Sequence, residues 1–295
     1  MTVPAEFLAK VRAIEIASRK LVRDGMAGAY TSAFRGSGMQ FREFRSYVYG
    51  DDVRHISWNV SARQQDPVLK VFEEERERTV LLVVDVSGSL RRGPWAGRKA
   101  ERLAEIAATL ALSALENNDK VGSLLFSDQV ERIVTPEKGR TQLLRIIRDV
   151  LIYEPEGLRT NPDLALRHLD RVLNKHSIVF FLSDMEVLPS ESTLKRVASK
   201  HELIAIGVDH PGEWEMPGFQ GFLELQTAEA GRPVTLDLSS SDIQEYLRRH
   251  GQTRREIIAE MYRRAGVDLV WSRTDEDYVP TLQGFFRRRA GTGRR

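Results

Sequence analysis

Short runs of aliphatic residues recur through the middle and the end of the chain, and each predicts a strand buried on both faces of a parallel sheet. The predicted strands cover Val80 to Val84, Val121 to Phe126, Ile178 to Leu182, Leu203 to Val208 and Val267 to Trp271. Between them, apolar residues recur at helical spacing. These helical patterns begin near Arg98, follow Gly139 and Pro162, and cover about Glu191 to Lys200 and Asp242 to Ala265. Strands that alternate with helices predict an α/β fold with a doubly wound, mostly parallel sheet of the Rossmann type.

The pattern is different before the first of these strands. Apolar residues at near-helical spacing predict an amphipathic helix from Pro4 to about Asp24. From Arg35 to Arg63 the chain is rich in Gly, Arg and aromatic residues without a sustained period, which predicts an irregular arm with short strands, followed by a strand at Val68 to Glu74. We therefore expect an N-terminal helix and arm, residues 1–76, packed on a sheet domain of residues 77–290.

Two smaller features complete this organisation. The strings FLELQT and PVTLDL, separated by AEAGRP, predict a small hairpin from Phe222 to Leu238, within an insertion of about residues 212–240. The basic run from Phe285 to Arg295 carries no aromatic stacking pattern, and we interpret it as solvated, with a basic tail at residues 291–295.

The arm has two interpretations. Arg42, Arg45, Asp52 and Arg54 are candidates for a partner-binding surface, because charged and aromatic residues are concentrated around them. The same mixture, with Trp58 among it, also suits an ion-paired brace that is buried on the sheet. We favour the brace.

Composition excludes several classes of function. Lys and Arg total 44 against 42 Asp and Glu, so bulk charge gives no reason to expect a nucleic-acid partner. The chain has no cysteine, which excludes disulfides, zinc thiolate sites and cysteine nucleophiles and is compatible with a reducing cytosol. The longest apolar segments, such as Ile106 to Leu115, are shorter than the roughly 20 residues of a membrane helix. Because the N-terminus has no signal-peptide core, we expect a cytoplasmic protein without an integral membrane segment.

Polar side chains follow the predicted strands at the edge where ligands bind in doubly wound sheets. Asp85 ends the first strand, with Ser87 and Ser89 in the next loop; Asp184 follows the strand at Ile178 to Leu182, and Thr160 precedes a helix. Two carboxylates and three hydroxyls suit a hard cation, Mg²⁺ first and then Mn²⁺ or Ca²⁺. With so few charged ligands we expect weak binding, with Kd on the order of 10⁻⁴ to 10⁻³ M. Alternatively, the serines, Thr160 and Asp184 are ordinary turn and helix-capping residues.

The spacing of these residues resembles a known motif. The string DVSGS is similar to the Asp-x-Ser-x-Ser signature of the metal-ion-dependent adhesion site (MIDAS) in von Willebrand factor A-like domains. Thr160 and Asp184 stand where that motif has its threonine and second aspartate. The resemblance implies a von Willebrand A-like fold and a metal that captures an Asp or Glu of a client protein.

The preceding residues resemble a narrower family. The strings GSGMQFREFRSYVYGDDVRHISWNVSAR and LKVFEEERERTVLLVVDVSGS are similar to the bacterial family of unknown function DUF58. This resemblance implies an adaptor or co-chaperone that works with a MoxR-type AAA+ ATPase. Many relatives carry membrane helices ahead of the arm, which we do not expect here.

An enzyme is the alternative class. Asp85 at a strand end suits the nucleophile of a metal-dependent phosphohydrolase, but a haloacid-dehalogenase-like enzyme has a second acid two residues later, where this chain has Ser87. The sequence contains no Gly-x-x-x-x-Gly-Lys-Ser/Thr phosphate loop. We therefore expect a binding module rather than an enzyme.

Overall fold

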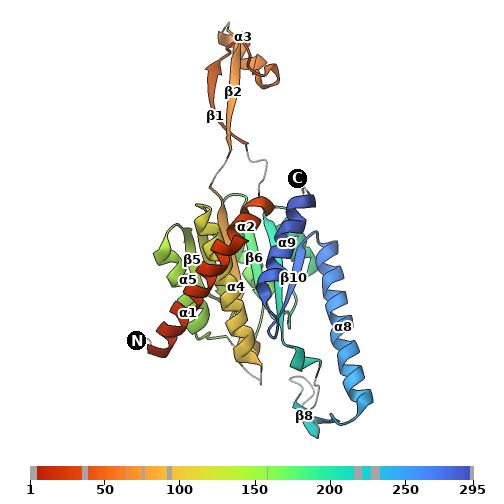
Figure 1. Cartoon of the computed structure of the whole chain (residues 1–295). Helices are drawn as coiled ribbons and strands as arrows, with labels where there is room; N and C mark the ends of the chain where they lie inside the picture. Colours follow the sequence, from red (N-terminus) through yellow and green to blue (C-terminus); the bar gives the residue numbers. More distant parts are fainter. Residues whose placement is uncertain are drawn as a thin grey trace.

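A six-stranded sheet forms the centre of the molecule (Figure 1). This computed structural model describes residues 5–34, 39–64, 66–74, 77–91, 95–157, 159–215, 221–226 and 233–292. The sheet consists of β3 (Thr79–Asp85), β4 (Lys120–Phe126), β5 (Val130–Glu137), β6 (Ile178–Ser183), β7 (Glu202–Asp209) and β10 (Asp268–Arg273). Their spatial order is β10-β7-β6-β3-β4-β5, and all neighbours run parallel except β4 and β5. The predicted doubly wound, mostly parallel sheet is therefore confirmed.

Helices cover both faces of the sheet, because successive residues of the buried strands point to opposite sides. In β3, Val80, Leu82 and Val84 face one hydrophobic cluster, whereas Leu81 and Val83 face the other. The first cluster is completed by α1 (Ala5–Leu21), α2 (Ala27–Ala33), α4 (Ala96–Glu116), α5 (Arg140–Ile152) and α9 (Tyr278–Thr292). The second is completed by α6 (Pro162–Val172), α7 (Glu191–Ala198) and α8 (Ser241–Arg264). Three layers thus enclose two cores.

Two parts of the sheet domain differ from the sequence interpretation. β5 was not predicted, because its residues are mostly half-buried at the sheet edge and lack a continuous apolar run. The basic run at the C-terminus is not simply a solvated tail. Its described part, up to Thr292, belongs to α9, which buries Phe286 completely among the aromatic rings of Tyr30 and Phe34; the last three residues of the predicted tail lie outside the described residues.

The arm also differs from expectation. β1 (Met39–Ser46) pairs with β2 (Val68–Glu74) as an antiparallel ribbon, and α3 (Trp58–Gln64) packs on its far end. Figure 1 shows this arm extending away from the sheet, and the Trp58 side chain is 70% exposed. β1 and β2 pair with each other and not with the six-stranded sheet, and Arg45 and Arg54 form ion pairs within the arm. The arm therefore stands as a projection and not as the buried brace that we expected.

The predicted hairpin is also present. β8 (Phe222–Gln226) pairs antiparallel with β9 (Pro233–Asp237), between β7 and α8 in the chain. It forms a separate two-stranded sheet, which Figure 1 shows near the start of α8.

Candidate functional site

The two predicted carboxylates emerge at one edge of the sheet. β3 pairs in parallel with β6, with Val84 opposite Leu182, so Asp85 and the Ser183–Asp184 turn follow the same edge. β3 and β6 are also the neighbours at which the strand order reverses, since β4 lies on one side of β3 and β6 on the other. Ligands of doubly wound sheets bind in the crevice at such a switch point.

Asp85 is held in place by its neighbours at this edge. Its Oδ1 accepts a hydrogen bond from the Ser87 amide at 2.9 Å, and its Oδ2 accepts one from the Ser183 hydroxyl at 2.8 Å. Burial, together with the nearby charge of Asp184, raises the pKa of Asp85 to about 6, although the bonds from Ser87 and Ser183 oppose this rise. Such a buried carboxylate is stabilised by a cation.

The two serines of the motif bring their hydroxyls together. The Oγ atoms of Ser87 and Ser89 are 3.2 Å apart, and Ser87 is fully buried. Ser87 precedes the 3₁₀ turn Gly88–Leu90, but its side chain makes no capping hydrogen bond there. The capping alternative therefore does not account for Ser87.

Thr160 reaches the same edge by another route. The next residue, Asn161, donates its amide to the Ser127 carbonyl at 2.8 Å, which ties this loop to the end of β4 beside β3. Asn161, and not Thr160, caps α6 by accepting from the Leu164 amide at 3.1 Å. Thr160 is half-buried and, within the described part of the chain, has no hydrogen bond to the other four predicted ligands.

Asp184 contacts a cation that sequence reasoning missed. Its Oδ2 lies 3.1 Å from Nζ of Lys99, in the first turn of α4, and Nζ is also 2.7 Å from Oε1 of Glu213. Burial alone would lower the pKa of Lys99, but Asp184 and Glu213 more than reverse this, so the pKa is raised. No spacing signal links these three residues, which are far apart in the sequence.

The segment that carries Glu213 is fixed against α4. The His210 ring stacks on Trp95 with centroids 3.9 Å apart, and its Nδ1 accepts from the Gly212 amide at 2.9 Å. Gly212 is needed here, because a Cβ would lie 2.6 Å from the Trp95 ring.

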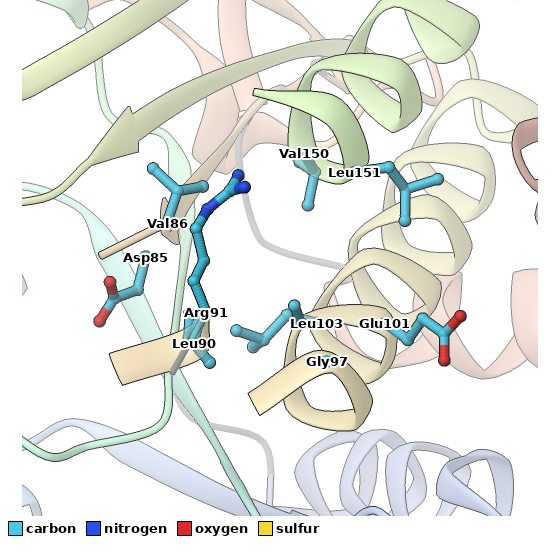
Figure 2. A pocket seen from close by; sticks show the side chains of 10 residues that line it. Asp85, Val86, Leu90, Arg91, Gly97, Glu101, Leu103, Val150 and Leu151 are labelled. Atoms are coloured by element: carbon cyan, nitrogen blue, oxygen red, sulfur yellow. The ribbon is translucent and has the colours of Figure 1, made fainter. Parts of the chain in front are cut away.

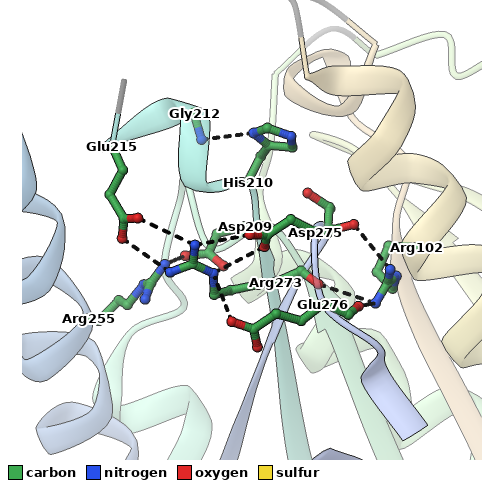
Figure 3. A network of polar contacts seen from close by, with 10 residues as sticks. Arg102, Asp209, His210, Gly212, Glu215, Arg255, Arg273, Asp275 and Glu276 are labelled. Carbon is green, nitrogen blue, oxygen red and sulfur yellow. Dashed lines mark hydrogen bonds and ion pairs between the residues drawn. The ribbon is translucent and has the colours of Figure 1, made fainter. Parts of the chain in front are cut away.

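An ionic network surrounds the neighbouring strand ends (Figure 3). Asp209 at the end of β7 pairs with Arg255 of α8, and Arg273 at the end of β10 lies 3.1 Å from Oε1 of Glu215. Arg102 of α4 donates to backbone carbonyls of residues 273, 274 and 276. These contacts join α4, α8 and two strands beside Lys99.

A cavity of about 280 Å³ lies next to Asp85 (Figure 2). It is bounded by the loop after β3, the start of α4 and the end of α5. Apolar side chains contribute most of its lining: Val86, Leu90, Leu103, Val150 and Leu151. Figure 2 shows the Asp85 carboxylate at one end of this cavity, pointing away from Arg91.

The chemistry of the donor set fits a hard cation. Asp85 keeps an unused lone pair on each oxygen, and the adjacent hydroxyls of Ser87 and Ser89 are further oxygen donors. Lys99 partly neutralises Asp184, so Asp184 suits an outer, water-mediated role better than direct ligation. In the described residues no three His, Cys, Asp or Glu side chains are grouped to hold a metal. The candidate site therefore depends on serine and threonine hydroxyls as well as on its two carboxylates.

The predicted partner-binding residues lie on the arm. Arg45 forms a two-point ion pair with Asp51 at 2.8 Å, and Arg54 pairs with Asp52 at 2.7 Å. The side chain of Arg42 lies outside the described residues. The charged pairs of the arm are thus mutually neutralised.

The family model described as "Protein of unknown function DUF58" matches residues 43–257, from β1 of the arm into α8. The chain belongs to the DUF58 family. Most of the arm and all five residues of the candidate site therefore lie within the residues that the DUF58 model matches.

Individual relatives and solved structures resemble this DUF58 protein at low sequence identity. The "Uncharacterized protein Rv1480" of Mycobacterium tuberculosis is 27% identical over 282 residues, which span 94% of this chain and 88% of that protein. An aerotolerance-related membrane protein from Bacteroides fragilis matches 73% of this chain and 99% of its own, with 15% identity and a TM-score of 0.42. The SpRpn10 VWA domain matches 70% and 93%, with 8% identity and a TM-score of 0.39.

None of the described helices is both long enough and apolar enough to cross a membrane.

Proposed function

We propose that this DUF58 protein is a divalent-metal-dependent protein-interaction module. Asp85, Ser87, Ser89, Thr160 and Asp184 would hold Mg²⁺, or else Mn²⁺ or Ca²⁺, and an Asp or Glu of a partner would complete the shell. The observation that carries the proposal is the buried Asp85 carboxylate beside the Ser87 and Ser89 hydroxyls, which lie 3.2 Å apart and of which Ser87 makes no capping hydrogen bond to the 3₁₀ turn that follows it. The bound metal would supply an electrophilic site for a carboxylate.

Charge at the site supports a weak resident metal. Asp85 and Asp184 are the predicted carboxylate ligands, and the Lys99 ammonium already offsets one of them. Few uncompensated charges give low affinity for a hard cation, with Kd on the order of 10⁻⁴ to 10⁻³ M. A partner carboxylate would bind together with the metal, and each would raise the affinity of the other.

Membership of the DUF58 family and the likeness of the sequence to MIDAS motifs support a partner class. We propose an adaptor or co-chaperone role with a MoxR-type AAA+ ATPase, in which a client supplies the acidic residue. Cytoplasmic placement stays a prediction.

Metal binding is tested by titrating Mn²⁺ into the full chain and recording the free Mn²⁺ signal by electron paramagnetic resonance. Asp85→Ala should abolish saturable binding, whereas Asp128→Ala, which removes an exposed acid at the end of β4, should leave it unchanged. Acetate, as a minimal carboxylate, should raise Mn²⁺ affinity for the parent. Equal binding by the parent and Asp85→Ala would disprove the site.

Partner capture is tested separately with a purified MoxR-type ATPase. Binding to the immobilised parent chain should require Mg²⁺, disappear with chelator and disappear with Asp85→Ala. Binding that is indifferent to chelator would contradict a metal bridge while leaving the adaptor role open to another surface.

A further inference from the structure

The arm and the candidate metal site lie at opposite edges of the sheet. β2 leads into the N-terminal end of β3, whereas Asp85 stands at its C-terminal end, roughly 20 Å away along the strand. Figure 1 shows the arm extending from the first edge, away from the second. The arm therefore presents its far end to other molecules and not to its own metal site.

The far end of the arm, which we call the arm tip, comprises the segments 46–58 and 66–68. It exposes apolar side chains: Tyr49 is 99% exposed, Trp58 70%, Val48 61% and Val53 57%. Large apolar side chains clustered in the open mark an interaction surface more strongly than scattered ones do.

One tip carboxylate is free for a cation. Asp51 and Asp52 are held by Arg45 and Arg54. Asp66, by contrast, is exposed and makes no side-chain hydrogen bond or ion pair with any residue that the structure describes. Among the described acids of the tip segments, Asp66 is thus the one without such a partner, and the same segments expose the apolar side chains named above.

The opposite edge of the same chain has the complementary chemistry. The proposed metal needs a carboxylate from another molecule, and the largely apolar cavity of about 280 Å³ begins at Asp85. A segment that presents both an acid and apolar side chains has the chemistry that such a surface accepts.

We propose that the arm tip of one copy binds the metal edge of a second copy, with Asp66 completing the metal shell and apolar tip side chains covering the adjacent cavity. This inference rests on the proposed metal-dependent capture of a carboxylate. Because donor and acceptor lie at opposite edges, the contact is head-to-tail, and repeated contacts produce a ring or an open chain of subunits.

The first test is the mass of the full chain in solution. With excess MgCl₂, sedimentation should show a weight-average mass that rises with concentration above the 33.6 kDa of one chain, and chelator should return it to 33.6 kDa. A single 33.6 kDa species at all concentrations in MgCl₂ overturns the inference.

Two substitutions test the two sides of the contact separately. Asp66→Asn removes the donor and Asp85→Asn the acceptor, and each should weaken self-association by about thirtyfold or more. Mixed together, the two variants should form one-to-one complexes and nothing larger, because only one tip and one metal edge remain competent. Glu43→Gln is the matched control, since Glu43 is an exposed acid on the same ribbon, away from the tip, and forms no ion pair with a residue that the structure describes; it should associate like the parent.

The outcomes separate this inference from the proposed function. If Mn²⁺ binds in an Asp85-dependent way but the chain stays monomeric, the tip is not the metal's partner and only this inference fails. If Mn²⁺ does not bind, both fail. Assembly that survives Asp66→Asn, or a tip that binds lipid vesicles while the chain stays monomeric, also overturns the head-to-tail contact.

Discussion

The sheet domain and the arm both contain aromatic and charged residues, but the sheet domain buries several of them, whereas those of the arm are mostly exposed. In the sheet domain, Phe286 is fully buried and Lys99 is enclosed by two carboxylates. In the arm, Trp58 stands in solvent and Arg54 meets Asp52 on an exposed surface. The aromatic and charged residues of the arm therefore contribute little to its own stability, which leaves them available for contacts with other molecules.

The largest contrast in stability concerns aromatic residues. Phe286→Ala should lower the free energy of unfolding by about 4 kcal/mol, because it leaves a cavity beside Tyr30 and Phe34. Urea unfolding followed by circular dichroism measures the loss. Phe286→Leu, which fills more of the space, should lower the free energy of unfolding clearly less than Phe286→Ala does. A loss below about 1 kcal/mol for the alanine variant would mean that α9 is the solvated tail suggested by its basic sequence.

The second contrast concerns charged residues. Lys99→Met leaves Asp184 and Glu213 without their shared cation. It should lower the free energy of unfolding of the metal-free protein, measured by urea unfolding, by about 3 kcal/mol. Arg54→Met on the arm is the matched control and should leave the unfolding midpoint unchanged, because that pair is exposed. The Lys99 variant should also bind Mn²⁺ more tightly, since Asp184 is released. Equal midpoints for the two variants would contradict the structural role of Lys99.

Much of the sheet domain was predictable because its strands obey a strong constraint. A strand buried on both faces must be apolar throughout, as in β3 and β6, and both appear where the pattern predicted them. β5 is half-exposed at an edge, so its mixed composition gave no signal. α9 was hidden because its arginines suggested solvent, although Phe285 and Phe286 lie in the core.

The site and the arm contain some contacts that the sequence predicts and others that it does not. Asp85, Ser87 and Ser89 are neighbours in sequence, so their shared edge followed from one strand end. The pairing of Lys99 with Glu213 depends on a fold that joins distant segments, and no local pattern encodes it. The charges and aromatics of the arm suited a partner-binding surface as well as the buried brace that we favoured, because the sequence does not show whether these side chains pack on the sheet or face solvent.

A third contrast compares two aspartates whose pKa values shift in opposite directions. Burial and Asp184 raise the pKa of Asp85 from 3.8 to about 6, so its ionised form is disfavoured in the folded state. In metal-free protein, the free energy of unfolding should therefore fall as pH rises from about 4 to about 6. Asp85→Asn removes this loss and should stabilise the metal-free protein at pH 7 by about 3 kcal/mol. Thermal or urea unfolding across pH measures the difference.

The control for this third contrast is Asp52. The side chain of Arg54 lowers the pKa of Asp52 to about 2, so its charged form is favoured and Asp52→Asn should bring no gain at pH 7. Excess MgCl₂ should stabilise the parent but not Asp85→Asn, because only the parent retains the charged ligand. A variant that is less stable than the parent without metal would show that Asp85 supports the fold rather than a ligand.

The smallest expected change in stability is at the arm tip. Trp58→Ser should alter the free energy of unfolding by no more than about 0.5 kcal/mol, because the indole is 70% exposed and fills no core. The same substitution should weaken metal-dependent self-association by about tenfold, since an exposed tryptophan contributes mainly when a partner covers it. Sedimentation in MgCl₂ and urea unfolding of the same preparation measure both quantities. A variant that loses stability but not association would place Trp58 with Phe286, as a residue that the fold itself requires.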